Sequence, residues 1–219
     1  MKKKTTLFTC ILLTACLFTG CAADNNFVPT EYAYSTDEVS ALDIDVRDRQ
    51  VSISASDDEL IHIESFTSSQ EYYRVSVSSD RVLSMDIAYN KDWTDYIGSA
   101  KPSDSYRQIS VRVPDSMLSS IAVDTTNENI SLSSLSVTGS IDLNSNGGNV
   151  YVSKADAPSI RLETKNGNIS GSVTGSINDY SIDTSGSKKG ECNLSDRTGG
   201  SKLLRVKANN GDINISFTE

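Results

Sequence analysis

Residues 141–152 read Ile-Asp-Leu-Asn-Ser-Asn-Gly-Gly-Asn-Val-Tyr-Val, and this pattern recurs through the second half of the chain. Aliphatic residues stand at the first, third, tenth and twelfth places, with polar residues and glycine between the two runs. Alternation with a period of two puts one row of side chains into a core and the other into water. The Asn-Gly step predicts a turn, since Gly and Asn adopt positive φ at the lowest cost.

Segments 121–132, 160–171 and 204–215 repeat the spacing of the first ten places. Segment 42–53 also repeats it without a glycine, and a sixth copy from Tyr180 to Leu194 fits if its turn is three residues longer. One such unit cannot bury its apolar row alone, whereas stacked units bury a continuous row. We therefore predict a short β-solenoid of repeats of about 20 residues over 121–219. A β-sandwich of hairpins is the alternative, because Asn-Gly turns also close hairpins.

The first half of the repeat-bearing region is the same kind of chain with less regular spacing. Alternating segments predict strands at 60–64, 73–77, 82–89 and 109–113, and residues 90–106 predict a surface loop. No helical periodicity and no linker composition interrupts these segments. We expect one all-β, elongated domain over residues 37–219.

The N-terminus has the features of an export signal. Three lysines precede an apolar segment at 7–18, which is too short to span a bilayer comfortably. Residues 17–21, Leu-Phe-Thr-Gly-Cys, resemble a bacterial lipobox, which implies cleavage of residues 1–20 and a diacylglyceryl group on Cys21. A plain secretory signal is the alternative. Residues 21–36 are then expected to be a flexible tether, and the protein to be extracytoplasmic and held on the bacterial cell membrane by the lipid.

Charge and cysteine content exclude several classes of partner and cofactor. Residues 1–20 hold three of the 20 basic residues and none of the 29 acidic ones, so their removal changes the net charge from −9 to −12. Such a surface repels phosphates, so nucleic acid is not an expected partner. Cys10 and Cys16 lie in the signal, which leaves Cys192 as the one cysteine besides Cys21. No disulfide and no cofactor are expected.

Catalytic residues are not apparent in the sequence. The chain has one histidine, His62, in an alternating strand, where an ordinary structural histidine is the expectation rather than a general base. A second histidine for a metal pair and a Gly-x-Ser-x-Gly elbow are both missing from the sequence. Cys192 aligns with Ile130, Val150, Ile169 and Ile213 of the other copies, which predicts an inward, small-hydrophobe role.

The outward row three residues into each copy offers a candidate binding face. It reads Asp124, Asn144, Glu163 and Asp183, with Lys207 at its end. Stacked about 4.8 Å apart, these side chains would form a ladder of oxygens, in which a cation such as Ca²⁺ would relieve the repulsion. The Gly-Gly-x-Gly-x-Asp repeat of known Ca²⁺ solenoids is missing, so a solvated acidic face is the expectation.

The sequence also predicts one ion pair and one group of aromatic contact residues. Asp142 and Arg161 are expected to be neighbours on adjacent repeats and to form an exposed ion pair. Trp93, Tyr96 and Tyr106 lie in the long insertion, where aromatic side chains either contact sugars or proteins or cover the edge of the sheet.

Finally, the chain resembles the DUF4097 family of extracytoplasmic, adhesin-like bacterial proteins. The resemblance is carried by Val-Arg-Val-Pro at 111–114, by the units Asn-Gly-Asn-Ile at 166–169 and Asn-Gly-Asp-Ile at 210–213, and by Ile-Ser-Phe at 215–217. It implies a β-solenoid-like fold without established enzymatic activity. We expect a lipid-anchored, non-enzymatic surface protein that binds an envelope protein or a glycan. A role as accessory to an envelope-stress response is the alternative, and a polysaccharide-acting enzyme is a third.

Overall fold

The computed structural model describes residues 27–91, 101–184 and 188–218, and these ranges contain strands and two short 3₁₀ turns. The prediction of an all-β fold is confirmed. The strands of the first half are β1 (Val28–Ser35), β2 (Ala41–Asp45), β3 (Gln50–Ala55), β4 (Leu60–Thr67), β5 (Glu71–Val77), β6 (Val82–Tyr89) and β7 (Gln108–Val113). Those of the second half are β8 (Ser120–Thr125), β9 (Ile130–Ser133), β10 (Ser140–Ser145), β11 (Val150–Ala155), β12 (Ser159–Thr164), β13 (Ile169–Thr174), β14 (Tyr180–Asp183), β15 (Lys202–Ala208) and β16 (Ile213–Thr218).

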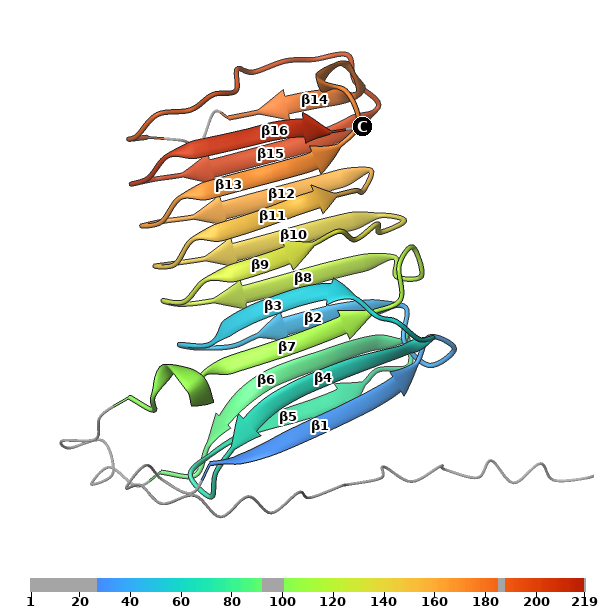
Figure 1. The fold of residues 1–219 in the computed structure, drawn as a ribbon, viewed down its shortest axis with the longest axis vertical. Coiled ribbons are helices and arrows are strands. Elements are labelled where there is room, and N and C mark those ends of the chain that lie inside the picture. The colour runs from blue at the N-terminus through green and yellow to red at the C-terminus, as the bar shows by residue number, and fades with distance from the viewer. Residues whose placement is uncertain (1–26, 92–100, 185–187, 219) are drawn as a thin grey trace, which may run out of the picture.

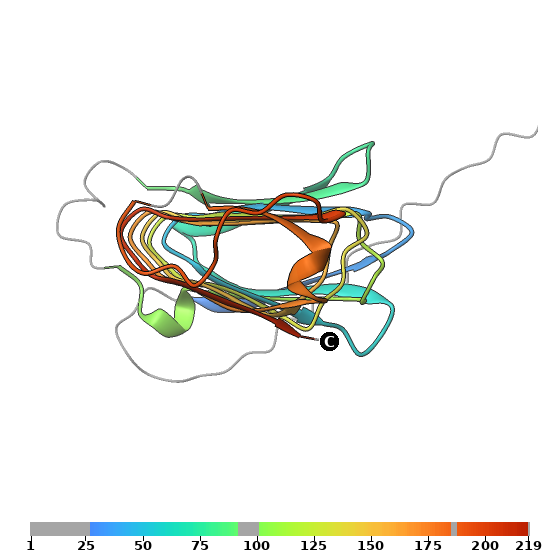
Figure 2. The same cartoon turned by 90° about the horizontal axis from the view of Figure 1, so that it is seen from above.

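The strands form two eight-stranded sheets that face each other across one core (Figures 1 and 2). Sheet A has the order β1-β4-β7-β3-β9-β11-β13-β16, and sheet B the order β14-β15-β12-β10-β8-β2-β6-β5. Each repeat gives its first strand to sheet B and its second to sheet A, and successive repeats pair in parallel. Hairpins would pair in antiparallel fashion, so the structure is the predicted solenoid and not the sandwich of hairpins.

The order of the repeats in space differs from their order in the chain. The β2–β3 repeat lies between β6–β7 and β8–β9, because β2 pairs with both β6 and β8, and β3 with both β7 and β9. At the other end β15 pairs with both β12 and β14, so the last repeat lies inside the β14 layer. At each end of the solenoid the chain therefore first forms an outer layer and then returns to place a later layer inside it.

The core consists of rows of aliphatic side chains that run along the stack. Residues at the first place of each repeat are paired in register across sheet B and are almost fully buried: Leu42, Ile121, Ile141, Ile160 and Leu204. The tenth place gives a second such row in sheet A: Val51, Ile130, Val150, Ile169 and Ile213. The period-two pattern therefore specifies which side of each strand is buried.

The glycines of the turns serve close packing between repeats, and the prediction that they adopt positive φ is wrong. A Cβ atom on Gly148 would lie 2.0 Å from the carbonyl oxygen of Glu128, one repeat away. Gly167 and Gly211 have the same relation to the repeats beneath them, at 2.1 and 2.0 Å. Positive φ occurs elsewhere, for example at Gly171 and Gly175. These turn positions thus require glycine because the neighbouring backbone occupies the place of a side chain.

Buried hydroxyl groups hold the stacked turns in register. Thr125 donates a hydrogen bond to the carbonyl of Arg49, and Ser145 to that of Glu128, both at 2.8 Å. Thr164 donates to the carbonyl of Gly148, also at 2.8 Å. Each hydroxyl is nearly inaccessible to water and satisfies a carbonyl that would otherwise be buried without a partner.

The N-terminal end of the stack is antiparallel, and part of the predicted tether belongs to it. β1 pairs along its whole length with β4, so residues 28–35 are a strand, contrary to the prediction that 21–36 is flexible. Tyr32 and Tyr34 pack against the core from β1, and this burial stabilises the strand. Pro29 near its start suits an edge strand, which donates no hydrogen bonds on its outer side.

A buried ion-pair network joins this end to the solenoid. Arg49, in the β2–β3 turn, stands at the place that Gly148 occupies two repeats further along the stack, and its side chain turns inward with 2% of its surface exposed. Its guanidinium pairs with the carboxylate of Glu71 on β5 and donates to the hydroxyl of Tyr73 at 2.9 Å. Lys91 also pairs with Glu71. The carboxylate of Glu71 thereby joins its own strand, β5, to the β2–β3 turn and to the residues that follow β6.

Cys192 occupies the register that the sequence predicts but is not buried. It forms a parallel bridge with Ile213, which continues the row of Ile169 and Ile213. The side chain is nevertheless exposed, because this outermost layer lacks a further repeat above it, and Leu194 is the buried residue there. The inward role that we predicted for Cys192 is therefore wrong.

Candidate functional site

The predicted binding face is the outer surface of sheet B, and the structure places most of its residues in one row. Asp124, Asn144 and Glu163 are paired in register on β8, β10 and β12, followed by Lys207 on β15. Asp183 lies outside this row, because Ile182 rather than Tyr180 aligns with Leu204, which shifts β14 by two residues. Asp183 therefore faces Arg205 in the neighbouring row.

Polar side chains on this face bond to one another. Asn144 donates to Asp124 at 2.5 Å, and Arg205 donates to Asp183 at 2.8 Å. Arg161 bonds to Glu163 at 3.0 Å and lies 3.7 Å from Asp142, which confirms the predicted Asp142–Arg161 pair. Such exposed pairs contribute about 0.2–1 kcal/mol each and help to fix the register of the repeats. Part of the hydrogen-bonding capacity of this face is thus used within the protein.

Further along sheet B, acidic side chains oppose each other on three adjacent strands. Asp45 on β2 is paired in register with Asp86 on β6 and Asp124 on β8. Partial burial raises the pKa of Asp45, and the charges of Asp124, Asp43 and Asp86 raise it further. In the described part of the chain, no three His, Cys, Asp or Glu side chains are grouped as ligands for a metal ion.

The outer face of sheet A differs in its chemistry. Strands β3, β9, β11 and β13 contain no Asp or Glu, whereas each of the facing strands β2, β8, β10 and β12 contains at least one. Serine is the commonest outward residue on the four sheet A strands. The central strands of the two sheets thus differ, because acidic residues are confined to those of sheet B.

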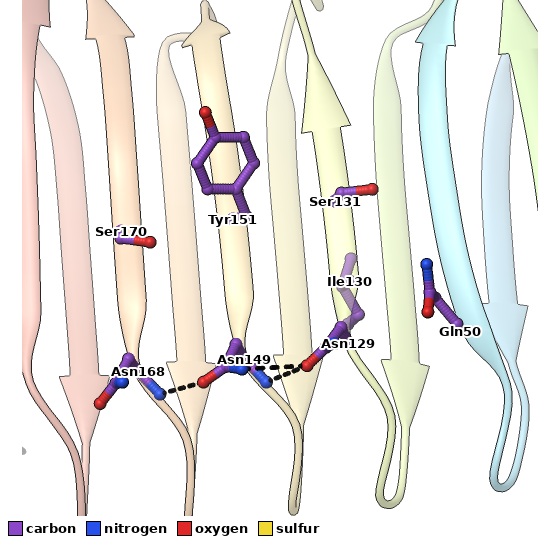
Figure 3. Close-up of a pocket in the computed structure, with 8 residues that line it drawn as sticks. All are labelled: Gln50, Asn129, Ile130, Ser131, Asn149, Tyr151, Asn168 and Ser170. Atoms are coloured by element: carbon purple, nitrogen blue, oxygen red, sulfur yellow. Dashed lines mark hydrogen bonds between the residues drawn. The ribbon is translucent and has the colours of Figure 1, made fainter.

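A shallow groove of about 440 Å³ lies on the outer face of sheet A (Figure 3). It crosses four adjacent strands of sheet A. Its lining residues are Gln50, Asn129, Ile130, Ser131, Asn149, Tyr151, Asn168 and Ser170. None carries a charge, and seven of the eight have a side-chain amide or hydroxyl group.

One side of the groove is an asparagine ladder, Asn129, Asn149 and Asn168, at the start of successive sheet A strands. The side-chain oxygen of Asn129 accepts from the backbone of Asn149 at 2.8 Å, and that of Asn149 accepts from the backbone of Asn168 at 2.8 Å. Asp212 continues the ladder by donating its backbone N–H to Asn168 at 2.9 Å. These bonds fix the amides before any ligand arrives, which lowers the entropic cost of binding.

Tyr151 stands at the centre of the groove between two serines. It is paired in register with Ser131 on one side and Ser170 on the other, and 49% of its surface is exposed. Figure 3 shows its ring face-on, with only short side chains beside it. The hydroxyls of Ser131, Tyr151 and Ser170 make no side-chain hydrogen bonds to other described residues. They are available to a ligand.

Sequence reasoning did not identify this groove, although its signal was present. Asn129, Asn149 and Asn168 occupy the ninth place of three successive copies, next to the turn. Tyr151 interrupts a column that otherwise holds Ser131 and Ser170. A large aromatic residue in an outward column of small ones does not serve the core, and this signal would have indicated a surface site.

The side chain of His62, for which we expected a structural role, lies near two carboxylates. Its Nε2 lies 2.9 Å from a carboxylate oxygen of Asp58, and its Nδ1 lies 3.7 Å from Glu31. Hydrogen bonds from the backbone of Leu60 and from the side chains of His62 and Ser56 lower the pKa of Asp58 to about 2.

The remaining predicted contact residues lie partly outside the described ranges. Cys21, Trp93 and Tyr96 fall outside them. Tyr106 is described and packs between Phe27 and Phe66, with ring centroids 5.2 and 5.5 Å apart. For Tyr106 the alternative of covering the sheet is therefore confirmed. None of the helical turns in the described ranges is long and apolar enough to cross a membrane.

Comparison with solved structures shows a similar fold in a protein of known structure. A "putative cell adhesion protein" from Clostridium sporogenes superposes with a TM-score of 0.50 at 11% identity, covering 87% of this chain and 100% of that one. "Putative adhesins" from Bacteroides fragilis and Parabacteroides distasonis are 13% and 14% identical, with TM-scores of 0.36 and 0.32. They cover 86% and 87% of this chain, and 97% and 98% of their own.

Sequence comparison places the chain in a family. No curated protein sequence is significantly similar to it. The family model described as Toastrack DUF4097, however, matches residues 39–219, which include every repeat of the solenoid. The resemblance inferred from the repeat motifs is thereby confirmed, and the chain belongs to the Toastrack DUF4097 family.

Proposed function

We propose that this protein is a non-catalytic, adhesin-like binding protein of the bacterial envelope, and that it binds through the groove on sheet A. The observation that carries the proposal is the groove itself, a hollow of about 440 Å³ on the outer face of sheet A. Its eight lining residues include no carboxylate, imidazole or thiol, and Tyr151 is the one side chain among them of a type that serves as a general acid or base. They do offer fixed amides and available hydroxyls, which suits recognition.

The groove is a better candidate than the acidic face of sheet B. Asn144 bonds to Asp124 and Arg161 bonds to Glu163, so a ligand on sheet B competes with these side chains for part of their hydrogen-bonding capacity. The hydroxyls of Ser131 and Ser170 make no side-chain bonds to other described residues, so a ligand there displaces only water.

Two variants, each with one new lysine, test whether the ligand binds the outer face of sheet A or that of sheet B. Ser131→Lys fills the groove, and Asn144→Lys is the matched control on a central strand of sheet B. Both positions point outward, so neither change disturbs the core. We expect the labelled, detergent-purified full-length protein to bind intact envelopes of a strain that lacks it. Ser131→Lys should reduce this binding at least about tenfold, which corresponds to about 1.4 kcal/mol, and Asn144→Lys should leave it within about twofold.

The opposite result, loss with Asn144→Lys and retention with Ser131→Lys, would assign binding to sheet B. Circular dichroism and melting curves of both variants exclude unfolding as the cause of a loss. Binding that neither lysine affects would contradict the use of either face.

The membrane anchor is part of the same proposal. The lipobox-like sequence that ends at Cys21 supports a diacylglyceryl group on this residue, and two acyl chains hold a protein stably on a membrane. Cys21→Ala should therefore move the protein from the washed membrane fraction to the soluble extracytoplasmic fraction, as measured by immunoblotting. Cys192→Ala is the control and should remain with the membrane. Retention of Cys21→Ala in the membrane would refute the lipid anchor.

A further inference from the structure

From the chemistry of the groove we infer that its ligand is an uncharged polysaccharide, with one sugar ring lying on the face of Tyr151. This inference rests on the proposed function and specifies the ligand of the same site. Its observations are the neutral lining, the fixed row of amides, and one exposed aromatic ring between two serines.

Charge is the first reason. The full chain has a net charge of −9, yet the residues that line the groove carry no charge at all. An acidic polymer would be repelled by the molecule as a whole and would find no cation in the groove. A cationic ligand would be attracted to sheet B instead, where Asp45, Asp86 and Asp124 are neighbours on adjacent strands. The groove therefore matches a neutral ligand.

The kind of polar group is the second reason. Amides and hydroxyls both donate and accept hydrogen bonds, as sugar hydroxyls and acetamido groups do. Asn129 and Asn149 are held in place by the ladder, while the hydroxyls of Ser131 and Ser170 have no side-chain bonds to other described residues. The open ring face of Tyr151 provides a flat, weakly polar platform, on which the C–H face of a sugar ring can pack (Figure 3).

The shape of the groove indicates an extended chain rather than a single sugar. The amide row runs from Gln50 through Asn129 and Asn149 to Asn168, across four adjacent strands. Adjacent strands are about 4.8 Å apart, a repeat similar to the advance of one sugar in an extended β-linked glycan. A glycan that crosses the strands can thus repeat the same contacts on successive repeats of the protein.

A peptide is the main competing ligand, and the structure disfavours it. Peptides commonly bind sheets by adding a strand at an open edge. The groove lies on the face of β9, β11 and β13, whose backbone groups are engaged by strands on both sides. Binding through side chains would need apolar pockets, but the only apolar lining residues are Ile130, which is buried, and Tyr151.

Calorimetric titration of the full-length protein with short oligosaccharides tests the inference. The probes are cellopentaose and chitopentaose, which are neutral, and pentagalacturonic acid, which is charged. We expect binding of at least one neutral probe and none of the acid. Tyr151→Ala should weaken the neutral interaction at least about tenfold, while Tyr151→Phe should stay within about threefold because the ring remains. Tyr72→Ala is the matched control, since Tyr72 is similarly exposed (42%) but lies on β5 at the edge of sheet B.

Envelopes digested with protease, so that polysaccharide remains, separate failure of this inference from failure of the proposed function. Binding that survives digestion and depends on Tyr151 supports the glycan. Tyr151-dependent binding that digestion abolishes, together with no response to any neutral probe, overturns the glycan in favour of a protein ligand and leaves the proposed function intact. Envelope binding that neither Tyr151→Ala nor Ser131→Lys weakens overturns both. Oligosaccharide binding that Tyr151→Ala does not weaken refutes the assigned site.

Discussion

Replacement of Glu71 by Gln is expected to lower the free energy of unfolding by about 3–5 kcal/mol, because it leaves a buried guanidinium without its carboxylate. Arg49 is 2% exposed and Glu71 6% exposed, so water cannot compensate for the loss. The same carboxylate also pairs with Lys91, and Arg49 bonds to Tyr73. Removing one negative charge therefore disturbs the junction of the β2–β3 turn, β5 and the end of β6.

Urea denaturation followed by circular dichroism measures this effect, and thermal melting should show a decrease in Tm of about 6–20 °C. Glu64→Gln is the matched control, since Glu64 pairs with Arg112 at 2.7 Å but both side chains are partly exposed. An exposed pair contributes at most about 1 kcal/mol. Equal losses in the two variants would contradict the special role of burial at Glu71.

Replacement of Gly148 by Ala is expected to cost about 3 kcal/mol, the upper part of the range for overpacking. The new Cβ would lie 2.0 Å from the carbonyl oxygen of Glu128 and 2.2 Å from its carbon. Both are backbone atoms held by the hydrogen bond from Ser145, so they cannot move without separating two repeats. The loss of stability arises from this steric collision and not from the backbone φ angle of residue 148.

The adjacent residue provides the control. A Cβ on Gly147 would meet the side-chain oxygen of Asn127 at 2.9 Å, and its nearest backbone contacts would be at 3.1 and 3.3 Å, which require much smaller shifts than the 2.0 Å contact at Gly148. Gly147→Ala should cost less than about 1.5 kcal/mol in the same urea titration. Similar losses for the two alanines would show that flexibility of the glycine pair, rather than contact between repeats, determines the stability of this turn.

The regular part of the fold was predictable because each repeat contains its own pattern. Ile141, Leu143 and Val150 alternate with polar residues in a way that only a strand with one buried side explains, and the copies at 121 and 160 repeat it. Copies of one pattern bury their apolar rows only by stacking, which gave the solenoid. The row of Asp124, Asn144 and Glu163 followed from the same alignment.

The ends of the stack were not predictable, because pairing of a strand depends on which edge remains open. The pattern of 42–53 is that of any repeat, and nothing in it says that β2–β3 lies between β6–β7 and β8–β9. The two-residue shift of β14 against β15 placed Asp183 in another row, and exposure of the last layer left Cys192 in solvent. Both depend on contacts between residues far apart in the chain.

The candidate groove was likewise predictable only in part. The sequence determined which residues point outward from sheet A, since a period of two fixes the side of each strand. That Gln50, from the β2–β3 repeat, lies beside Asn129, and that short serines beside Tyr151 leave a hollow, follows from the pairing of distant strands. The repeating unit, its buried row and its outward row can be read from the order of amino acids alone, because these depend on local alternation. The order of the layers, the buried Arg49–Glu71 pair and the groove depend on which distant strands meet, and that was decided by packing of the whole chain.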